Sequence, residues 1–187
     1  MKTVFFDIDT QLDFVLPSGA LYAPGAESIL ETVAALNRRA PVVVSTMDAH
    51  AEDDVEFREW PHHCVAGCLG QRKAAATLLD KPVIVPNRAE DISIGGARQI
   101  IIEKQTVDCF SNIHLNTILF ELNADRYVVY GVVTEICVRI AAFGLLKTGR
   151  RVEVVTDAIQ SFNTEAGART LAEFRSAGGI LTTAAQV

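Results

Sequence analysis

The sequence predicts an α/β fold, specifically a doubly wound three-layer α/β/α sandwich with a mainly parallel sheet of about six strands. Short runs of β-branched and apolar residues alternate with segments of helical length along the whole chain. Several of these runs are apolar on both faces, which is typical of parallel strands that helices cover on both sides. Right-handed crossovers between such strands produce the doubly wound arrangement.

Length and composition limit the classes of function. The 187 residues fit one domain spanning 1–187, and a hydrophobic content of 49% predicts a core that needs no disulfides. The net charge is −6 and no run of Lys or Arg is present, so nucleic acid is excluded as a partner. No apolar run reaches the roughly 18–20 residues of a membrane span, and the N-terminus does not resemble a secretion signal. We therefore expect a cytoplasmic protein with reduced cysteines and no membrane partner.

The first half of the chain predicts a strand, a helix and a strand, followed by a long loop. Thr3–Ile8 is rich in Val, Phe and Ile, and Ser28–Arg39 places apolar residues at helical spacing. Pro41–Ser45 is typical of a buried strand. Residues 48–80 lack clean periodicity in their first half, which predicts a long functional loop. A further short apolar run follows at Pro82–Val85.

The second half continues the alternation of strands and helices. Helices are predicted where apolar residues recur with helical spacing or where a Thr cap precedes an acidic first turn. The predicted segments, strands and helices in turn, are Gln99–Ile102, Asn112–Leu122, Tyr127–Tyr130, Thr134–Thr148, Val152–Val155, Thr164–Ala177 and Ile180–Thr182.

Functional residues in such a sheet lie at the carboxyl ends of the strands. Asp9 follows the first strand, where it can serve as a base or simply cap a turn. Lys104 follows the buried run before it, where an ammonium group is costly to desolvate unless it is paired or functional. The alternative for Lys104 is a surface position just beyond the strand.

Cys137 lies where a strand passes through a tight turn into a helix. The strand ends at Gly131 and the helix begins near Thr134, so the thiol is in the first helical turn. The helix dipole and the free N–H groups of that turn are expected to lower the thiol pKa, and the same N–H groups can hold an oxyanion. The alternative is a buried structural cysteine.

Asp48, His50, Glu56 and His63 form a usable ligand set for a divalent metal ion. Zinc, iron and manganese all suit two carboxylates and two imidazoles. The alternative is a solvated acidic loop, and a neighbouring acid can replace Glu56 as the ligand. The acids that crowd this segment are Glu52, Asp53, Asp54, Glu56 and Glu59.

Five motifs, taken together and in this order, resemble the isochorismatase-like cysteine hydrolases, and within them the nicotinamidase branch. The likeness runs from about residue 3 to residue 183, and each motif alone is weak. The metal motif and Trp60-Pro61 narrow the likeness towards nicotinamidases. The motifs are Asp9–Phe14, Asp48–His50, Trp60–Cys64, Lys104 with Asp108–Ser111, and Gly131–Cys137.

The resemblance implies an amidohydrolase that acts on a linear, non-peptide C–N bond and converts nicotinamide to nicotinate and ammonia through a cysteine thioester. By position, Cys137 matches the nucleophile, Asp9 the general base and Lys104 the cation that holds both. The backbone N–H groups of Val133 and Cys137 match the oxyanion hole, and a cis peptide bond is expected between Val132 and Val133.

The resemblance also implies a small-molecule amide substrate and a bound divalent metal ion. The metal set Asp48, His50, Glu56 and His63 would coordinate the pyridine nitrogen, with the ring sandwiched between Phe14 and Trp60. Two alternatives stay open, namely another small amide or carbamoyl substrate, and a non-catalytic metal-binding module. Homo-oligomers are common among such proteins, but the sequence leaves the oligomeric state open.

Overall fold

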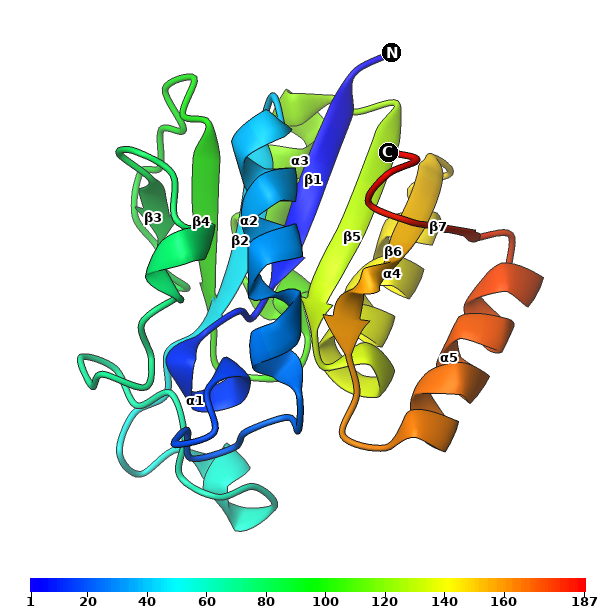
Figure 1. Ribbon diagram of the computed structural model, residues 1–187. Coiled ribbons are helices and arrows are strands. Elements are labelled where there is room, and N and C mark those ends of the chain that lie inside the picture. Colours follow the sequence, from blue (N-terminus) through cyan, green and yellow to red (C-terminus); the bar gives the residue numbers. More distant parts are fainter.

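Seven parallel strands form one sheet in the order β3-β4-β2-β1-β5-β6-β7 in the computed structural model, which describes residues 1–187 (Figure 1). Every neighbouring pair is parallel. The predicted parallel sheet is therefore confirmed, although it has seven strands rather than about six. The strands are β1 (Thr3–Ile8), β2 (Val43–Asp48), β3 (Val83–Val85), β4 (Gln99–Lys104), β5 (Arg126–Val132), β6 (Arg151–Gln160) and β7 (Ile180–Thr182).

Helices cover both faces of the sheet and complete the three predicted layers. Figure 1 shows α2 in front of the sheet and α3 and α4 behind it. No helix combines the length and the apolar character that crossing a membrane requires. The helices are α1 (Leu12–Val15), α2 (Leu30–Arg39), α3 (Leu115–Leu122), α4 (Arg139–Leu146) and α5 (Thr164–Ser176).

Helix starts are where the structure differs most from the sequence prediction. α2 begins at Leu30 because the preceding residues, Ala26–Ile29, form a 3₁₀ turn. The long helix predicted from Thr134 begins instead with a turn of π-helix, Thr134–Val138, and only then continues as α4. Periodicity detects the shared apolar face of such segments but does not distinguish i→i+3, i→i+4 and i→i+5 hydrogen bonding at a helix end.

The core lies between the layers and consists of 43 buried hydrophobic residues. All six residues of β2 are buried, as expected for a strand with helices on both sides. Residues 48–80 form the predicted long loop, whose regular structure after Asp48 is limited to two 3₁₀ turns, Val55–Arg58 and Ala75–Thr77.

The carboxyl ends of β1, β2, β4 and β5 meet at the lower edge of the sheet in Figure 1. Gly131, the next-to-last residue of β5, brings two of these ends together. Its φ is +115°, and a Cβ on it would lie 2.1 Å from the carbonyl oxygen of Ile8. Only a glycine combines that dihedral with such a close approach, so β5 ends directly against the end of β1.

Candidate active site

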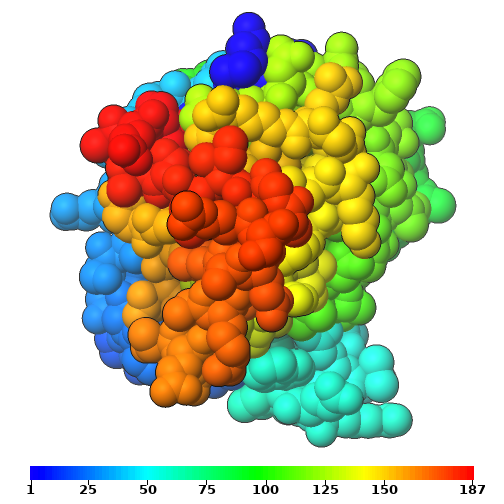
Figure 2. Space-filling model, turned by 90° about the vertical axis from the view of Figure 1, so that its right-hand side faces the viewer, coloured from blue at the N-terminus to red at the C-terminus, as the bar shows by residue number.

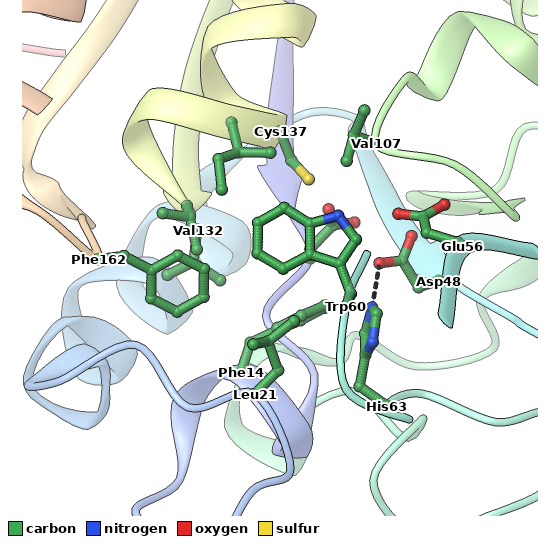
Figure 3. Close-up of a pocket in the computed structure, with 13 residues that line it drawn as sticks. Phe14, Leu21, Asp48, Glu56, Trp60, His63, Val107, Val132, Cys137 and Phe162 are labelled. Atoms are coloured by element: carbon green, nitrogen blue, oxygen red, sulfur yellow. Dashed lines mark ion pairs between the residues drawn. The ribbon is translucent and has the colours of Figure 1, made fainter. Parts of the chain in front are cut away.

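A pocket of about 330 Å³, measured to its open mouth, lies at this edge of the sheet (Figure 3). That volume suits a small single-ring molecule. Of the site residues predicted from sequence, all line the pocket except Lys104 and His50, which lie behind its wall. The lining residues are Asp9, Phe14, Leu21, Asp48, Glu56, Trp60, His63, Val107, Val132, Val133, Ile136, Cys137 and Phe162.

Asp9, Lys104 and Cys137 meet in one buried cluster. The Lys104 Nζ lies 3.0 Å from the Asp9 Oδ2 and 3.8 Å from the Cys137 Sγ. Lys104 is completely buried as the last residue of β4, so the alternative of a surface lysine is wrong. The three groups are thus arranged so that a cation contacts both an acid and a thiol.

Asp9 is held by its own backbone and by Thr46. Its φ of +48° lies in the left-handed region, which turns the chain sharply at the end of β1. The Thr46 hydroxyl donates to Asp9 Oδ1 at 2.6 Å, and the Asp9 N–H donates to the same hydroxyl oxygen at 3.1 Å. Burial raises the pKa of Asp9, and the nearby Lys104 opposes that shift.

Lys104 connects the cluster of Asp9 and Cys137 to Asp48. Its ammonium group also contacts the carboxylate of Asp48, so one cation serves two acids. Burial disfavours the charge on Lys104, but Asp48 and Asp9 outweigh burial and hold its pKa well above the ordinary value. Burial likewise opposes the charge on Asp48, yet Lys104, His50 and His63 hold the pKa of Asp48 below its usual range.

Cys137 lies inside the π-helical turn that follows β5. The Val132–Val133 peptide bond is cis, as the resemblance implied. The N–H groups of Ile136 and Val138 both donate to the Val133 carbonyl, at 3.0 and 3.1 Å, and close the turn around the cysteine. The turn therefore presents the thiol to the pocket.

The expectation of a lowered thiol pKa is wrong. Burial raises the pKa of Cys137 well above its ordinary value. Lys104 opposes this shift, while the carboxylates of Asp9 and Asp48 reinforce it. The local helix geometry was visible in the sequence, but the depth of burial and the two facing carboxylates were not.

Asp48, His50 and His63 form a trio whose ligand atoms all lie within 4.8 Å of one another. Both imidazole Nε2 atoms are 3.8 Å from Asp48 Oδ2. The His50 Nε2 is buried without a hydrogen-bond partner, which is costly unless something else binds it. Two imidazoles and a carboxylate fit a divalent transition metal ion, so the residues present suit the metal that the sequence predicted.

The other ring nitrogen of each imidazole is occupied, which orients the ring. His50 Nδ1 lies 3.0 Å from Asp54 Oδ2, and His63 Nδ1 lies 2.7 Å from the Pro61 carbonyl oxygen. Such outer contacts are typical of metal-binding histidines. Sequence reasoning counted Asp54 only among the crowded acids and did not identify this role. Glu56 is outside the trio and lies in the pocket wall, where burial raises its pKa.

Gln11 fixes the backbone of Asp48 from the neighbouring strand end. Its side-chain amide accepts from the Asp48 N–H at 2.7 Å and donates to the Asp48 carbonyl at 2.9 Å. Asp13 has a similar effect on the loop that carries His63, because its carboxylate accepts from the N–H of Cys64 at 2.7 Å. Sequence reasoning did not identify the contacts of Gln11.

Aromatic and aliphatic side chains form the remaining walls. Phe14 packs against His63 with ring centroids 5.3 Å apart, and Trp60 packs against Phe162 at 6.4 Å. Both predicted aromatic residues therefore line the pocket. The lining residues that sequence reasoning missed carry no chemical signal of their own, and are Leu21, Val107, Val132, Ile136 and Phe162.

A second buried ion pair lies deeper, behind the pocket. The Lys73 Nζ is 3.2 Å from Asp7 Oδ2, and both side chains are buried. Asp7 also accepts hydrogen bonds from Thr10 at 2.8 Å, Asn37 at 3.0 Å and Ser45 at 3.2 Å. The sequence gave no indication that these residues meet, because neither Asp7 nor Lys73 belongs to a motif.

Comparisons with known proteins agree with this geometry. Residues 3–186 match the isochorismatase domain. The chain is 28% identical over 187 residues to an uncharacterized isochorismatase family protein, PncA, of Bacillus subtilis strain 168, which spans 96% of this chain and 97% of that one. It is 22% identical over 189 residues to the nicotinamidase of Saccharomyces cerevisiae, across 84% of this chain and 87% of the relative.

A solved structure has a similar overall fold. The pyrazinamidase of Pyrococcus horikoshii, solved in complex with zinc, superposes with a TM-score of 0.83 at 28% identity, over 98% of this chain and 99% of that one. The match to the isochorismatase domain covers nearly the whole chain, and the relatives are named for amide hydrolysis. The chain therefore belongs to the isochorismatase family and is a nicotinamidase-like amidohydrolase.

Proposed function

We propose that the protein hydrolyses nicotinamide to nicotinate and ammonia, with Cys137 as nucleophile, Asp9 as general base and Lys104 as the cation between them. One observation carries this proposal. The Cys137 thiol opens into an aromatic-walled pocket 3.8 Å from Lys104, and Asp48 and His63 of the metal trio line the same cavity.

The first half of the reaction forms a thioester. Asp9 accepts the Cys137 proton, and the thiolate sulfur attacks the amide carbon. Burial raises the pKa of the Cys137 thiol, and Asp9 is the neighbouring carboxylate placed to take its proton. Lys104 stabilises the thiolate as it forms.

Backbone N–H groups of the cysteine turn stabilise the oxyanion of the tetrahedral intermediate. The N–H groups of Val133 and Cys137 are assigned this role, since both residues line the pocket next to the thiol. Protonated Asp9 then donates to the leaving nitrogen, and ammonia departs. A water molecule deprotonated by Asp9 hydrolyses the thioester and releases the carboxylic acid.

The Asp48, His50 and His63 trio distinguishes nicotinamide from a plain aromatic amide. When bound there, a divalent ion supplies a Lewis acid for the ring nitrogen of the substrate. Phe14 and Trp60 orient the ring by its faces, so that the amide carbon is held at the Cys137 sulfur. Glu56 is assigned to the pocket wall next to this trio.

Paired assays on nicotinamide and benzamide test the proposal. Benzamide has the shape of nicotinamide without the ring nitrogen. We expect ammonia release from nicotinamide to exceed that from benzamide at least about tenfold, as expected for the loss of one directed polar contact. His50→Ala is expected to remove both the bound metal and this preference. Equal rates on both amides would leave a cysteine amidohydrolase standing and contradict the nicotinamidase assignment.

Cys137→Ala provides the control for chemistry. We expect a loss of kcat of about 10⁵–10⁶-fold with an unchanged circular dichroism spectrum, because the covalent route is closed. Activity within about tenfold of wild type would contradict the nucleophile assignment.

A further inference from the structure

Two segments far apart in sequence meet across the mouth of the pocket. Trp60 belongs to the long loop after β2, and Phe162 lies between β6 and α5. Figure 2 shows the loop that carries Trp60, coloured cyan, projecting below α5, coloured orange. Their rings stack with centroids 6.4 Å apart and an interplanar angle of 28°. In Figure 3 the indole stands between Phe162 and the acidic wall of the pocket.

The two partners of this stack are anchored very differently. Asn163, next to Phe162, donates its N–H to Glu135 Oε1 at 2.8 Å and caps α5 through Ala166. Glu135 belongs to the same π-helical turn as Cys137. On the other side of Phe162, the Gln160 side chain donates to the Pro24 carbonyl. The backbone on both sides of Phe162 is therefore fixed by hydrogen bonds, and one of these bonds is to the turn that contains Cys137.

Trp60 is less firmly held. Its N–H donates to the Glu56 carbonyl at 3.1 Å within a 3₁₀ turn none of whose residues is buried. Its side chain is half-buried, and the stacked partner of its indole is Phe162. The position of the indole thus depends on a residue that is itself fixed to the cysteine turn.

The walls of the pocket are divided by polarity. The polar side chains of Asp48, Glu56 and His63 are all on the side of β2 and its loop. The opposite side, formed by Phe162 and Ile136, is apolar.

We propose that Phe162 is a specificity-determining residue. By stacking on the Trp60 indole it fixes the orientation of that ring, so that the pocket selects flat aromatic amides. The inference rests on the proposed amidase function and adds a residue that acts through Trp60 rather than on the reacting atoms. Removing Phe162 lets the indole rotate, so binding of a flat ring weakens while the Cys137 chemistry is unchanged.

Trp60 is the only tryptophan in the chain, so its emission reports this contact without turnover. We expect Phe162→Ala to shift the emission of the ligand-free protein to longer wavelength as the indole becomes more exposed. For nicotinamide, KM is expected to rise about three- to tenfold, the range of one aromatic pair, with kcat changed less than about twofold. Phe162→Tyr should restore both properties, and Phe162→Leu should restore neither fully.

Phe120→Ala is the matched control, because Phe120 is 86% exposed on α3 and outside the pocket. It should change neither the emission nor KM. An unchanged emission spectrum in Phe162→Ala, or a shifted spectrum with unchanged KM, would overturn the inference. If nicotinamide is not a substrate, the proposed function fails separately, and titration of the same emission with benzamide still tests whether Phe162 governs aromatic binding.

Discussion

Two buried aspartate–lysine pairs begin on the same strand, β1, and they differ in how completely they are satisfied. Asp7 pairs with Lys73 at 3.2 Å and also accepts three side-chain hydrogen bonds. Asp9 pairs with Lys104 through its Oδ2 at 3.0 Å and accepts one further side-chain hydrogen bond, from Thr46 to its Oδ1. The Asp7–Lys73 pair, the inner pair, thus has the more complete set of hydrogen bonds. The Asp9–Lys104 pair, the outer pair, is next to a pocket and a thiol.

This difference separates structural from catalytic use of the same two residue types. A buried ion pair whose other hydrogen-bonding positions are also occupied holds together the segments that carry it. Removing one partner leaves an uncompensated buried charge. A buried pair that borders a pocket and a thiol, as Asp9 and Lys104 do, is typical of functional sites. Variants of each pair should therefore change different properties.

The largest expected effect is on activity, from Asp9→Asn. The amide keeps the shape of the side chain but cannot accept the Cys137 proton, so kcat/KM for amide hydrolysis should fall about 10²–10⁴-fold. The free energy of unfolding, measured by urea titration, should change by less than about 1 kcal/mol, because the isosteric amide leaves no cavity and Lys104 retains Asp48. Full activity in Asp9→Asn would show that the Asp9–Lys104 pair, like the Asp7–Lys73 pair, is not required for the reaction.

The inner pair should show the opposite behaviour. Lys73→Met leaves Asp7 charged and unpaired in the core, and should lower the free energy of unfolding by about 3–5 kcal/mol. The folded fraction should retain its kcat, because Lys73 is outside the pocket. The double variant Lys73→Met with Asp7→Leu is the control, since removing both charges should recover most of the lost stability. A double variant as unstable as the single one would show that packing, not charge, dominates at this position.

A third ion-pair cluster, around the buried Glu153 at the amino end of the sheet, extends the comparison because its contribution to stability depends on pH. Glu153 accepts hydrogen bonds from Arg126 at 2.5 and 2.7 Å and from Arg151 at 2.5 Å. Burial alone would raise the pKa of Glu153, but the two guanidinium groups outweigh it and lower that pKa. The resulting stabilisation is present above the unfolded pKa, about 4.3, and is lost as pH falls through the folded pKa.

Glu153→Gln should therefore reduce the free energy of unfolding by about 1–3 kcal/mol at pH 7. The difference from wild type should shrink as pH falls below about 4.5, because the wild-type carboxylate becomes protonated. Chemical denaturation at pH 7, 5 and 3.5 measures this. A difference that stays constant over that range would mean that the charge of Glu153 contributes nothing to folding.

The sequence was most informative where chemistry coincides with a strand end. Asp9, Asp48 and Lys104 follow or end apolar runs, and a parallel sheet necessarily brings such positions together. Cys137 was recognisable from the turn after Gly131. The fold class followed from alternation alone, although the edge strands β3 and β7, of three residues each, left the strand count at about six.

The contacts that sequence reasoning missed depend on loops. Lys73 reaches Asp7 from a position 66 residues later along the chain, through a segment without periodicity. Phe162 is an ordinary apolar residue until the loop after β2 folds Trp60 onto it. Likewise, the sequence shows that Cys137 is near a helix start, but not how deeply it is buried.

Gly131 sets the spacing between Asp9 and Cys137 because it has no side chain. Because Gly131 lacks a Cβ, the end of β5 lies against Ile8, one residue before Asp9. The turn that carries Cys137 begins at Thr134, shortly after the end of β5. Any side chain there would push apart the two strands that carry the reacting groups. For protein engineering, position 131 should therefore stay glycine while the apolar residues that line the pocket are varied.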